Sequence, residues 1–298
     1  MDVFVAGGCS WDSIVYLDSF PDRTETHFAR DFQETLGSSG SGKALNLGRL
    51  GVDTRLHAMI GDDRYGEAIR ERFDAESVTF EADIDPNGTE RHVNLMNDAG
   101  ERISIFVVLP TQEPDIGYER LERWVAEADA LVVSPVNYSR HLLPAAVEAR
   151  TPVWADVHAY DGEDEYYDDF LAAADYLFMS EEGMDDYREF MREQIDAGKR
   201  LVVCTRGDDG VTALTADGEW VEVPAAEFEM TDTNGAGDAF FAGYLYGHRQ
   251  GLAVETNLRL GTLAGGLAVS SRDLAHPELS PDRLAAEYER RYGAEISA

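Results

Sequence analysis

The sequence has very few lysines and cysteines, and it has no long apolar run. Its 298 residues include only Lys43 and Lys199 as lysines, and only Cys9 and Cys204 as cysteines. Each cysteine ends an apolar strand-like run, so we expect buried thiols rather than a disulfide or a metal pair. No apolar run approaches the ~20 residues that a membrane-spanning helix needs. The opening MDVFVAGG enters a strand without a basic signal segment, and we expect a cytoplasmic protein with no membrane contact.

Positive charge is also scarce. The chain has 25 Lys and Arg against 58 Asp and Glu, a formal net charge of −33. The acidic residues are spread along the whole chain rather than gathered in a tail, which favours a solvated acidic surface. We interpret this as adaptation to a high-salt cytoplasm, where screening removes most of the self-repulsion. The alternative is a protein that binds basic partners. Nucleic-acid binding is not expected, because phosphates would be repelled.

Short apolar runs alternate with helical patterns along the chain. The length suits one large α/β domain over residues 1–298. This alternation predicts a doubly wound, mainly parallel sheet flanked by helices. The expected buried strands are 2–8, 130–134, 152–157, 176–180 and 200–205, and the expected helices are 42–50, 65–73, 118–128, 142–149 and 189–198.

Two stretches break this alternation. Residues 13–36 and 88–109 are polar and alternate with period two, and Asn97–Gly100 has the composition of a hairpin turn. We expect these stretches to form a small β-sheet that projects from the main domain. Such a sheet exposes a face or an edge, which calls for a partner or a ligand to cover it.

Residues 231–243, TDTNGAGDAFFAG, form the most informative run of the chain. Gly235 and Gly237 allow a tight turn and a close approach of the backbone to a ligand. The N–H groups at the start of the following apolar helix, together with the helix dipole, form an anion site. Asp238 lies at the edge of that site, where a carboxylate is placed to take a proton from a hydroxyl that attacks a phosphoryl group.

The same run resembles the signature Asp-Thr-x-Gly-Ala-Gly-Asp of the ribokinase, or PfkB, family of small-molecule kinases. The resemblance implies a ribokinase-like α/β fold with a β-sheet lid, formed here by 13–36 and 88–109, and the use of ATP and Mg²⁺. It implies that Asp238 is the catalytic base. The amides of Gly235, Ala236 and Gly237 would stabilise the transferring phosphoryl group and contact the nucleotide. In many members two lids pair, so a homodimer through the lid is expected.

The first predicted strand leads into Ser10 and Asp12, in the sequence GGCSWD. Ligands in open α/β sheets bind outside the carboxyl ends of the strands. Asp12 is therefore placed to accept hydrogen bonds from two neighbouring sugar hydroxyls; the alternative is a capping or turn residue. The family usually has Asn two residues before this Asp. Here that position is Ser10, which can still form a hydrogen bond but has a shorter reach.

Residues 36–51, LGSSGSGKALNLGRLG, resemble the family's first signature, Gly-Gly-x-x-x-Asn before a helix that ends in Leu-Gly. Counting back from the final glycine puts the Gly pair at Gly37 and Ser38 and the Asn at Gly42. These positions are the expected substrate contacts, and the chain departs from the signature at the last two. Lys43 either compensates for the missing Asn in binding the substrate or faces solvent in the first helical turn.

Nucleotide contacts follow from the resemblance at two further places. In residues 201–214 the family's ATP-contacting Thr and Gly match Thr205 and Gly207. The small-residue helix 257–271, which includes Ala264, would border the adenine pocket; the alternative is plain helix packing.

Metal contacts are implied in the same way. Asp232 and the carbonyls that follow the 257–271 helix would hold a monovalent cation, K⁺. The family's Asn-x-x-Glu box, which helps to place Mg²⁺ through water, is altered here, and only Glu181 or Glu182 can substitute.

The sequence therefore predicts an ATP-dependent kinase that phosphorylates a hydroxyl of a small sugar or sugar-like substrate. A nucleoside kinase is the second interpretation, kept open by Phe28, Phe32 and Phe106 as stacking candidates. A non-catalytic ligand-binding relative is the third, motivated by the altered Asn-x-x-Glu box.

We predict that the fold needs molar salt. A net charge of −33 destabilises the compact state unless it is screened, and the Debye length falls to about 3 Å at 1 M salt. The midpoint of a thermal melt should rise with KCl concentration between about 0.1 and 2 M, well beyond the rise in a sucrose control. A midpoint that does not move over this range would remove the main support for a high-salt adaptation.

Overall fold

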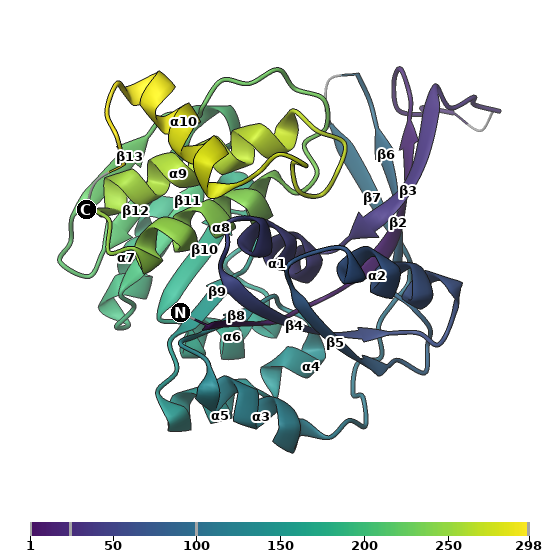
Figure 1. The fold of residues 1–298 in the computed structure, drawn as a ribbon, viewed down its shortest axis with the longest axis horizontal. Helices are drawn as coiled ribbons and strands as arrows, with labels where there is room; N and C mark the ends of the chain where they lie inside the picture. Colours follow the sequence, from purple (N-terminus) through teal and green to yellow (C-terminus); the bar gives the residue numbers. More distant parts are fainter. Residues whose placement is uncertain (1, 24–25, 99–100, 297–298) are drawn as a thin grey trace.

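A nine-stranded sheet forms the centre of the molecule (Figure 1). The computed structural model describes residues 2–23, 26–98 and 101–296. Its strands run parallel except at one edge, where β11, β12 and β13 pair antiparallel. The predicted doubly wound sheet is confirmed. In spatial order the strands are β13 (Trp220–Val223), β12 (Val211–Thr215), β11 (Leu201–Thr205), β10 (Tyr176–Ser180), β9 (Val153–Asp156), β8 (Ala130–Val133), β1 (Asp2–Ala6), β4 (Asp53–Ile60) and β5 (Thr79–Ile84).

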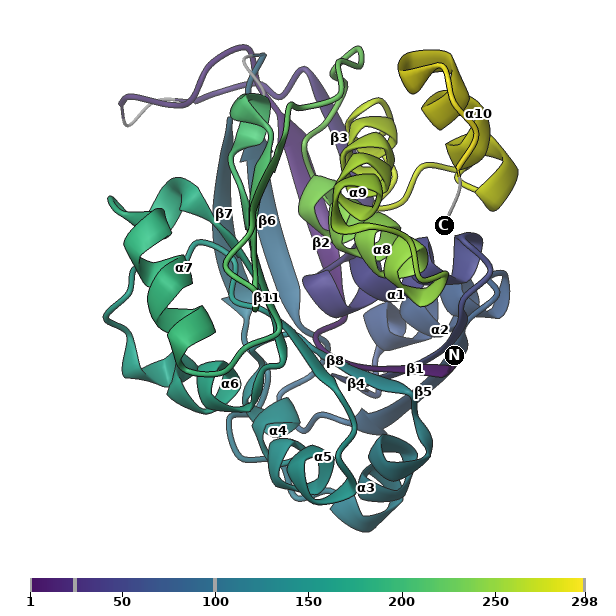
Figure 2. The same cartoon turned by 90° about the vertical axis from the view of Figure 1, so that its left-hand side faces the viewer.

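Helices cover both faces of this sheet (Figure 2). Strand residues alternate between two buried clusters: Val3 and Val5 of β1 belong to one, and Phe4 to the other. Both faces are therefore apolar, as expected of buried parallel strands. One face carries α1 (Ser39–Arg49), α2 (Arg64–Asp74), α8 (Ala236–Arg249), α9 (Val254–Val269) and α10 (Pro281–Tyr292). The other carries α3 (Tyr118–Glu127), α4 (Asn137–Arg140), α5 (Leu143–Ala149), α6 (Asp168–Ala173) and α7 (Tyr187–Asp196).

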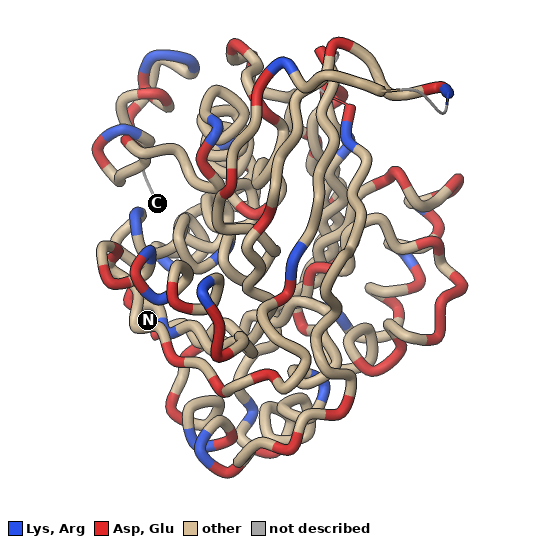
Figure 3. Tube along the Cα trace, turned by 90° about the vertical axis from the view of Figure 1, so that its right-hand side faces the viewer, with Lys and Arg blue, Asp and Glu red and all other residues tan. Residues whose placement is uncertain are grey.

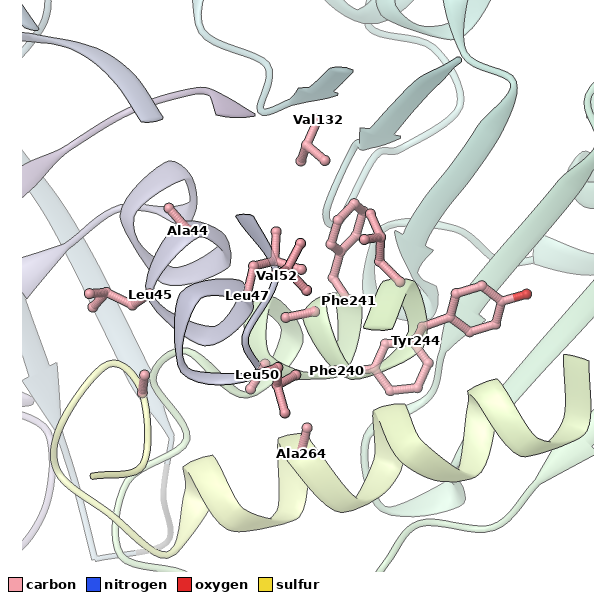
Figure 4. Close-up of a cluster of buried hydrophobic side chains, with 14 of the residues drawn as sticks. Ala44, Leu45, Leu47, Leu50, Val52, Val132, Phe240, Phe241, Tyr244 and Ala264 are labelled. Atoms are coloured by element: carbon pink, nitrogen blue, oxygen red, sulfur yellow. The ribbon is translucent and has the colours of Figure 1, made fainter. Parts of the chain in front are cut away.

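Helix α8 is the centre of the first face. Its side chains Phe240, Phe241 and Tyr244 lie among residues of α1, β8 and α9 (Figure 4). The backbone of α9 comes close because α8 has a glycine there: a Cβ atom built on Gly243 would lie 2.6 Å from the carbonyl oxygen of Leu260. This packing holds the start of α8, which contains the signature run, against the rest of the core.

A second, four-stranded sheet projects from the main body beside α1 and α2 (Figure 1). We call it the small sheet. The expected hairpin turn includes residues 99–100, which lie outside the described residues. That the small sheet moves as a lid, with the bounds expected from the sequence, remains a prediction. In spatial order its strands are β3 (Asp31–Gly37), β2 (Ser10–Tyr16), β6 (Arg91–Met96) and β7 (Arg102–Val108).

The surface is acidic on many parts of the chain. Figure 3 shows Asp and Glu positions along helices and loops throughout the view, with Lys and Arg interspersed. In the described ranges, no helix combines the length and apolar character needed to cross a bilayer.

Candidate functional site

The start of α8 is built as an open anion site. Gly235, which precedes α8, has a left-handed backbone with φ of 80°, and a Cβ atom there would lie 2.5 Å from the carbonyl oxygen of Leu274. Glycine is therefore required by both conformation and space. No side chain caps the helix at this residue, and Gly237 in the first turn is exposed. The N–H groups of this turn and the helix dipole favour a negative group here.

Asp238 sits in the same turn and contacts α1. Its Oδ1 accepts a hydrogen bond from the Ser39 hydroxyl at 2.6 Å and another from the Lys43 ammonium at 2.7 Å. A Cβ atom built on Gly42 would overlap Oδ2 of Asp238. The glycine that replaces the family's Asn thus lets the starts of α1 and α8 meet at the candidate base.

Lys43 is fully buried, with 0% of its side chain exposed, and its ammonium lies 2.9 Å from Oδ2 of Asp156. The solvent-facing alternative for Lys43 is therefore wrong. Asp156 ends β9, and burial alone would raise its pKa. The interactions with His158 and Lys43 outweigh burial and lower the pKa of Asp156 to about 2, so this carboxylate stays ionised.

Asp12 is buried on β2, with 2% exposed. Its Oδ2 accepts a hydrogen bond from the Asn94 amide at 3.1 Å, and His92 Nδ1 lies 3.4 Å from its Oδ1. His92 also contacts Glu90 at 2.8 Å. Burial alone would lower the pKa of His92, but Asp12 and Glu90 outweigh it and raise the pKa to about 9. Asp12 therefore belongs to a charged network within a strand rather than to a turn or a cap.

Two buried oxygens of this region, Ser10 Oγ and Asn94 Oδ1, find no hydrogen-bond partner among the described residues. A third, Asp12 Oδ1, lies 3.4 Å from His92 Nδ1 but likewise accepts no hydrogen bond within the described ranges. The side chains of Ser10 and Asp12 share one face of β2 because strand residues alternate. Asn94 shares that face, since its register partner on β2 is Ile14, two residues beyond Asp12. Buried polar groups are normally paired, so a cradle of unpaired acceptors suits a ligand that donates several hydroxyls.

Of the three aromatic residues considered for stacking, Phe106 borders this cradle. Its ring lies 4.0 Å from the His92 ring, centroid to centroid, and the side chain is 56% exposed. Phe32 pairs with Val15 and so lies on the opposite face of the small sheet. Phe28 is 89% exposed in the β2–β3 connection.

Gly37 and Ser38 connect the cradle to Asp238. A Cβ atom built on Gly37 would overlap the Asp12 carboxylate, and one built on Gly8 would overlap the Ser38 hydroxyl. Ser38 itself adopts φ of 68° just before α1. Because α1 begins at the next residue and Ser39 donates to Asp238, the segment from Gly37 to Ser39 contacts the Asp12 carboxylate at one end and the candidate base at the other.

Asp232 lies beside the C-terminal end of α9, because the N–H groups of Thr231 and Asp232 both donate to the carbonyl of Val269. Its carboxylate is buried and accepts hydrogen bonds from the Tyr16 hydroxyl and the Asn234 N–H, both at 2.8 Å. Burial and the bond to Asp232 raise the pKa of Tyr16, which keeps the phenol protonated as a donor.

The contact with Tyr16 is one of several that tie the small sheet to the signature region. Arg102 of β7 donates to the Asn234 side chain at 3.0 Å. Gln33 of β3 donates to the carbonyl of Arg272, in the segment after α9, also at 3.0 Å. The small sheet is therefore held against the loop that leads into α8.

Thr205 and Gly207 lie at the carboxyl end of β11, as an ATP contact requires. Thr205 pairs with Ser180 at the end of β10, and Gly207 adopts φ of 51° in the following turn. Glu181 and Glu182 follow Ser180 and line a cavity of about 500 Å³ whose other lining residues include Asp186 and Glu189 of α7. The described contacts of Asp238 include neither glutamate.

Ala264 lies inside the pair formed by α8 and α9. Only 1% of it is exposed, and a Cβ atom built on Gly243 would lie 2.9 Å from the Ala264 Cβ. The observed packing of its side chain is that of the helix-packing alternative, and a contact of Ala264 with adenine remains a prediction.

Sequence reasoning missed several residues of the site. Asp156 ends a predicted strand, so the rule that selected Asp12 could also have selected it. His92 and Asn94 lie in the stretch 88–109, and the sequence shows that its residues alternate between the two faces of a strand. The sequence does not show which of the two faces points toward Asp12. Nothing in the sequence alone indicated that Tyr16 reaches Asp232, because the two are 216 residues apart.

Comparison with known proteins gives one family. The pfkB family of carbohydrate kinases matches residues 2–281. The chain is 32% identical over 273 residues to acarbose 7(IV)-phosphotransferase of Actinoplanes sp., which covers 90% of this chain and 91% of that protein. It is 28% identical over 302 residues to the ATP-dependent ribose-1-phosphate kinase of Halopiger xanaduensis, with 97% and 99% covered.

A solved structure agrees. The microbiome-derived acarbose kinase Mak1 superposes with a TM-score of 0.88 at 26% identity, covering 98% of this chain and 99% of that one. The signature run at the start of α8, the doubly wound sheet with its small sheet, and these matches over nearly the whole length lead to one conclusion: the chain belongs to the pfkB family of carbohydrate kinases.

Proposed function

We propose that this protein transfers the γ-phosphoryl group of ATP to a hydroxyl of a neutral sugar, with Asp238 as the general base. The observation that carries the proposal is the place of Asp238: it lies at an open helix start suited to phosphate, and it contacts Ser39, two residues after Gly37, which packs against the Asp12 carboxylate of the acceptor cradle. In this arrangement Asp238 accepts the proton of the attacking hydroxyl. The amides of Gly235, Ala236 and Gly237 stabilise the charge that develops on the phosphoryl oxygens.

The charges around the acceptor cradle favour a neutral substrate. Asp12 and Glu90 surround a single cation, His92, and the nearby Lys43 is shared between Asp156 and Asp238. Four carboxylates thus face two cations. A substrate that already bears a phosphate would meet repulsion and find no unpaired cation in this group. The Halopiger relative is named for a phosphorylated sugar, so the two substrate classes can be compared directly.

A nucleoside is the second candidate acceptor, because Phe106 offers an exposed ring beside His92. An aromatic face can pack against a nucleobase or against the apolar face of a sugar ring. The unpaired oxygens of Ser10, Asp12 and Asn94 suit the hydroxyls of either class.

The residues fit ATP and cations to different degrees. The open start of α8 fits phosphate, and Thr205 and Gly207 lie where a nucleotide contact is expected. ATP supplies the phosphoryl group. Within the described ranges, no three or more His, Cys, Asp or Glu side chains are grouped so that they could hold a metal ion by themselves. The phosphates of ATP would therefore provide the remaining ligands of Mg²⁺. Glu181 or Glu182 would reach Mg²⁺ through water.

Asp232, buried beside the end of α9, would hold K⁺. A cytoplasmic location, with its supply of ATP and K⁺, is part of the proposal.

Replacing Asp238 tests the reaction. In a screen of neutral sugars, sugar 1-phosphates and nucleosides at high KCl, the wild-type protein should consume ATP with neutral sugars. Asp238→Asn should lose about 10²–10⁴-fold in kcat with the best acceptor while ATP binding persists, because general-base catalysis typically contributes that factor. ATP binding is measured by calorimetry.

The exposed Asp217 provides the control, and Asp217→Asn should keep wild-type turnover. Near-normal turnover of Asp238→Asn would remove this residue from the role of base. Failure of the wild-type protein with every acceptor, despite ATP binding, would favour the non-catalytic alternative. Preference for a sugar 1-phosphate would overturn the neutral-substrate argument.

Replacing Asp12 tests the acceptor cradle. Asp12→Ala should raise the KM of the acceptor about 10–100-fold and leave that of ATP nearly unchanged, because loss of a charged hydrogen bond costs roughly 1.5–3 kcal/mol for one ligand only. Steady-state kinetics with each substrate varied in turn measures both constants. Asp53→Ala, at the opposite end of the large sheet, is the control. Equal weakening of both substrates would contradict the placement.

We propose, finally, that the small sheet is the contact of a homodimer. Its outer face carries Phe32, Ile103 and Ile105, exposed by 55%, 42% and 46%. Ile105→Glu should convert a dimer into a monomer in sedimentation velocity, since a charge would be buried in an apolar contact. Val147→Glu, on the exposed surface of α5, is the matched control. A wild-type monomer, or an Ile105→Glu dimer, would contradict this role.

A further inference from the structure

Lys43 is enclosed more completely than any ordinary surface lysine. It lies one turn into α1 with 0% of its side chain exposed, and its ammonium lies 5.2 Å from the centre of the Phe241 ring of α8. An ammonium has three donors, and here each has an acceptor: Ser39 Oγ, Asp238 Oδ1 and Asp156 Oδ2. A buried charge with all its donors satisfied is held in one position.

The two oxygens of Asp238 are in different situations. Oδ1 accepts from both Ser39 and Lys43. Oδ2 lies over Gly42, where any side chain would overlap it. The carboxylate therefore has one oxygen held by hydrogen bonds from α1, whereas Oδ2 fills the space that a side chain at position 42 would take. Only Oδ2 is left to receive a proton from an acceptor hydroxyl.

Asp156 holds Lys43 from the other side. The N–H of His158 donates to Oδ1 of Asp156 at 3.0 Å, and the His158 ring nitrogen lies 3.6 Å from the same oxygen. Burial alone would lower the pKa of Lys43, but Asp156 and Asp238 outweigh it and raise that pKa above its ordinary value. Lys43 is thus a permanent cation.

We propose that Lys43 is the positioning residue of the catalytic base: it fixes Oδ1 of Asp238, turns Oδ2 toward the acceptor, and by its charge keeps the carboxylate ready to accept a proton. Asp156 anchors Lys43, and Ser39 completes the contact with Oδ1. This goes beyond a substrate contact for Lys43 and rests on the proposed role of Asp238. The groups that face Asp238 in this arrangement are Lys43 and Ser39 of α1, with Asp156 and His158 of β9 and its loop behind Lys43.

The decisive measurement is the pH dependence of kcat/KM for the best acceptor. In Lys43→Met the acid limb should move to higher pH, because a neighbouring opposite charge favours the ionised form of a carboxylate. At pH 7 kcat should fall at least about tenfold, because Oδ1 is no longer held in place, and the loss should become larger as the pH falls through the acid limb.

Two further variants control for unfolding and for the loss of a buried lysine in general. Lys43→Met leaves Asp156 and Asp238 facing each other without a cation, which could unfold the protein. The double variant Lys43→Met/Asp156→Asn removes one charge of each sign, so it should fold and still show the displaced acid limb. Lys199→Met is the matched control: this second lysine donates to the carbonyl of Leu171 and is not among the described contacts of Asp238, so its removal should leave the pH profile unchanged. Circular dichroism and thermal melts establish that each variant is folded.

The other outcomes overturn the inference. A folded variant with an unshifted acid limb and a uniform loss at every pH would make Lys43 a structural residue only. A rise in the acceptor KM with unchanged kcat and profile would make it a substrate contact instead. A wild-type protein without kinase turnover would instead contradict the proposed function. Failure of the proposed function can thus be distinguished from failure of the inference about Lys43.

Discussion

The buried ion pair between Lys43 and Asp238 requires the starts of α1 and α8 to meet. This meeting depends on glycine at two places: Gly42 leaves room for the Asp238 carboxylate, and Gly235 allows the turn that begins α8. The charges of the pair are costly to bury, and they are accepted because each of the three donors of the Lys43 ammonium has an acceptor. The acceptor cradle on β2 and β6 is connected to the same contact through Gly37, which ends β3 just before α1 and packs against the Asp12 carboxylate.

The remainder of the core supports this contact from behind. Phe240, Phe241 and Tyr244 point from α8 into the cluster shared with α1 and α9 (Figure 4). Because close-packed interiors transmit small displacements, a change in the pairing of α8 with α9 would move the first turn of α8 as well. The geometry of the candidate site therefore depends on how the helices pack on the first face of the sheet.

Much of this architecture could be predicted from the sequence. The expected strands 130–134, 152–157, 176–180 and 200–205 match β8, β9, β10 and β11, because buried parallel strands form continuous apolar runs. β4, with the sequence DTRLHAMI, was not anticipated, because its early polar residues interrupt such a run. The family signature located the helix start that contains Asp238, since glycines in that order have few other uses.

What escaped sequence reasoning depends on contacts between distant segments. A lysine near the start of a helix is ordinarily solvated, and only the packing of α1 against α8 shows that Lys43 is enclosed. The direction of each face of the small sheet likewise needed the register of β2 with β6, which places His92 and Asn94 beside Asp12.

The hydrogen bond from Tyr16 to Asp232 joins the two ligand sites energetically. Tyr16 lies on the strand that also contains Asp12, whereas Asp232 belongs to the loop that leads into α8. Any opening of the small sheet that separates them leaves a buried carboxylate with one donor fewer, which carries a free-energy cost. If the small sheet closes as a lid over the proposed sites, this coupling is reciprocal: a phosphate bound at the loop would favour the closed sheet, and an acceptor that holds the sheet closed would steady the loop. A single phenol would then make binding of the two substrates cooperative rather than independent.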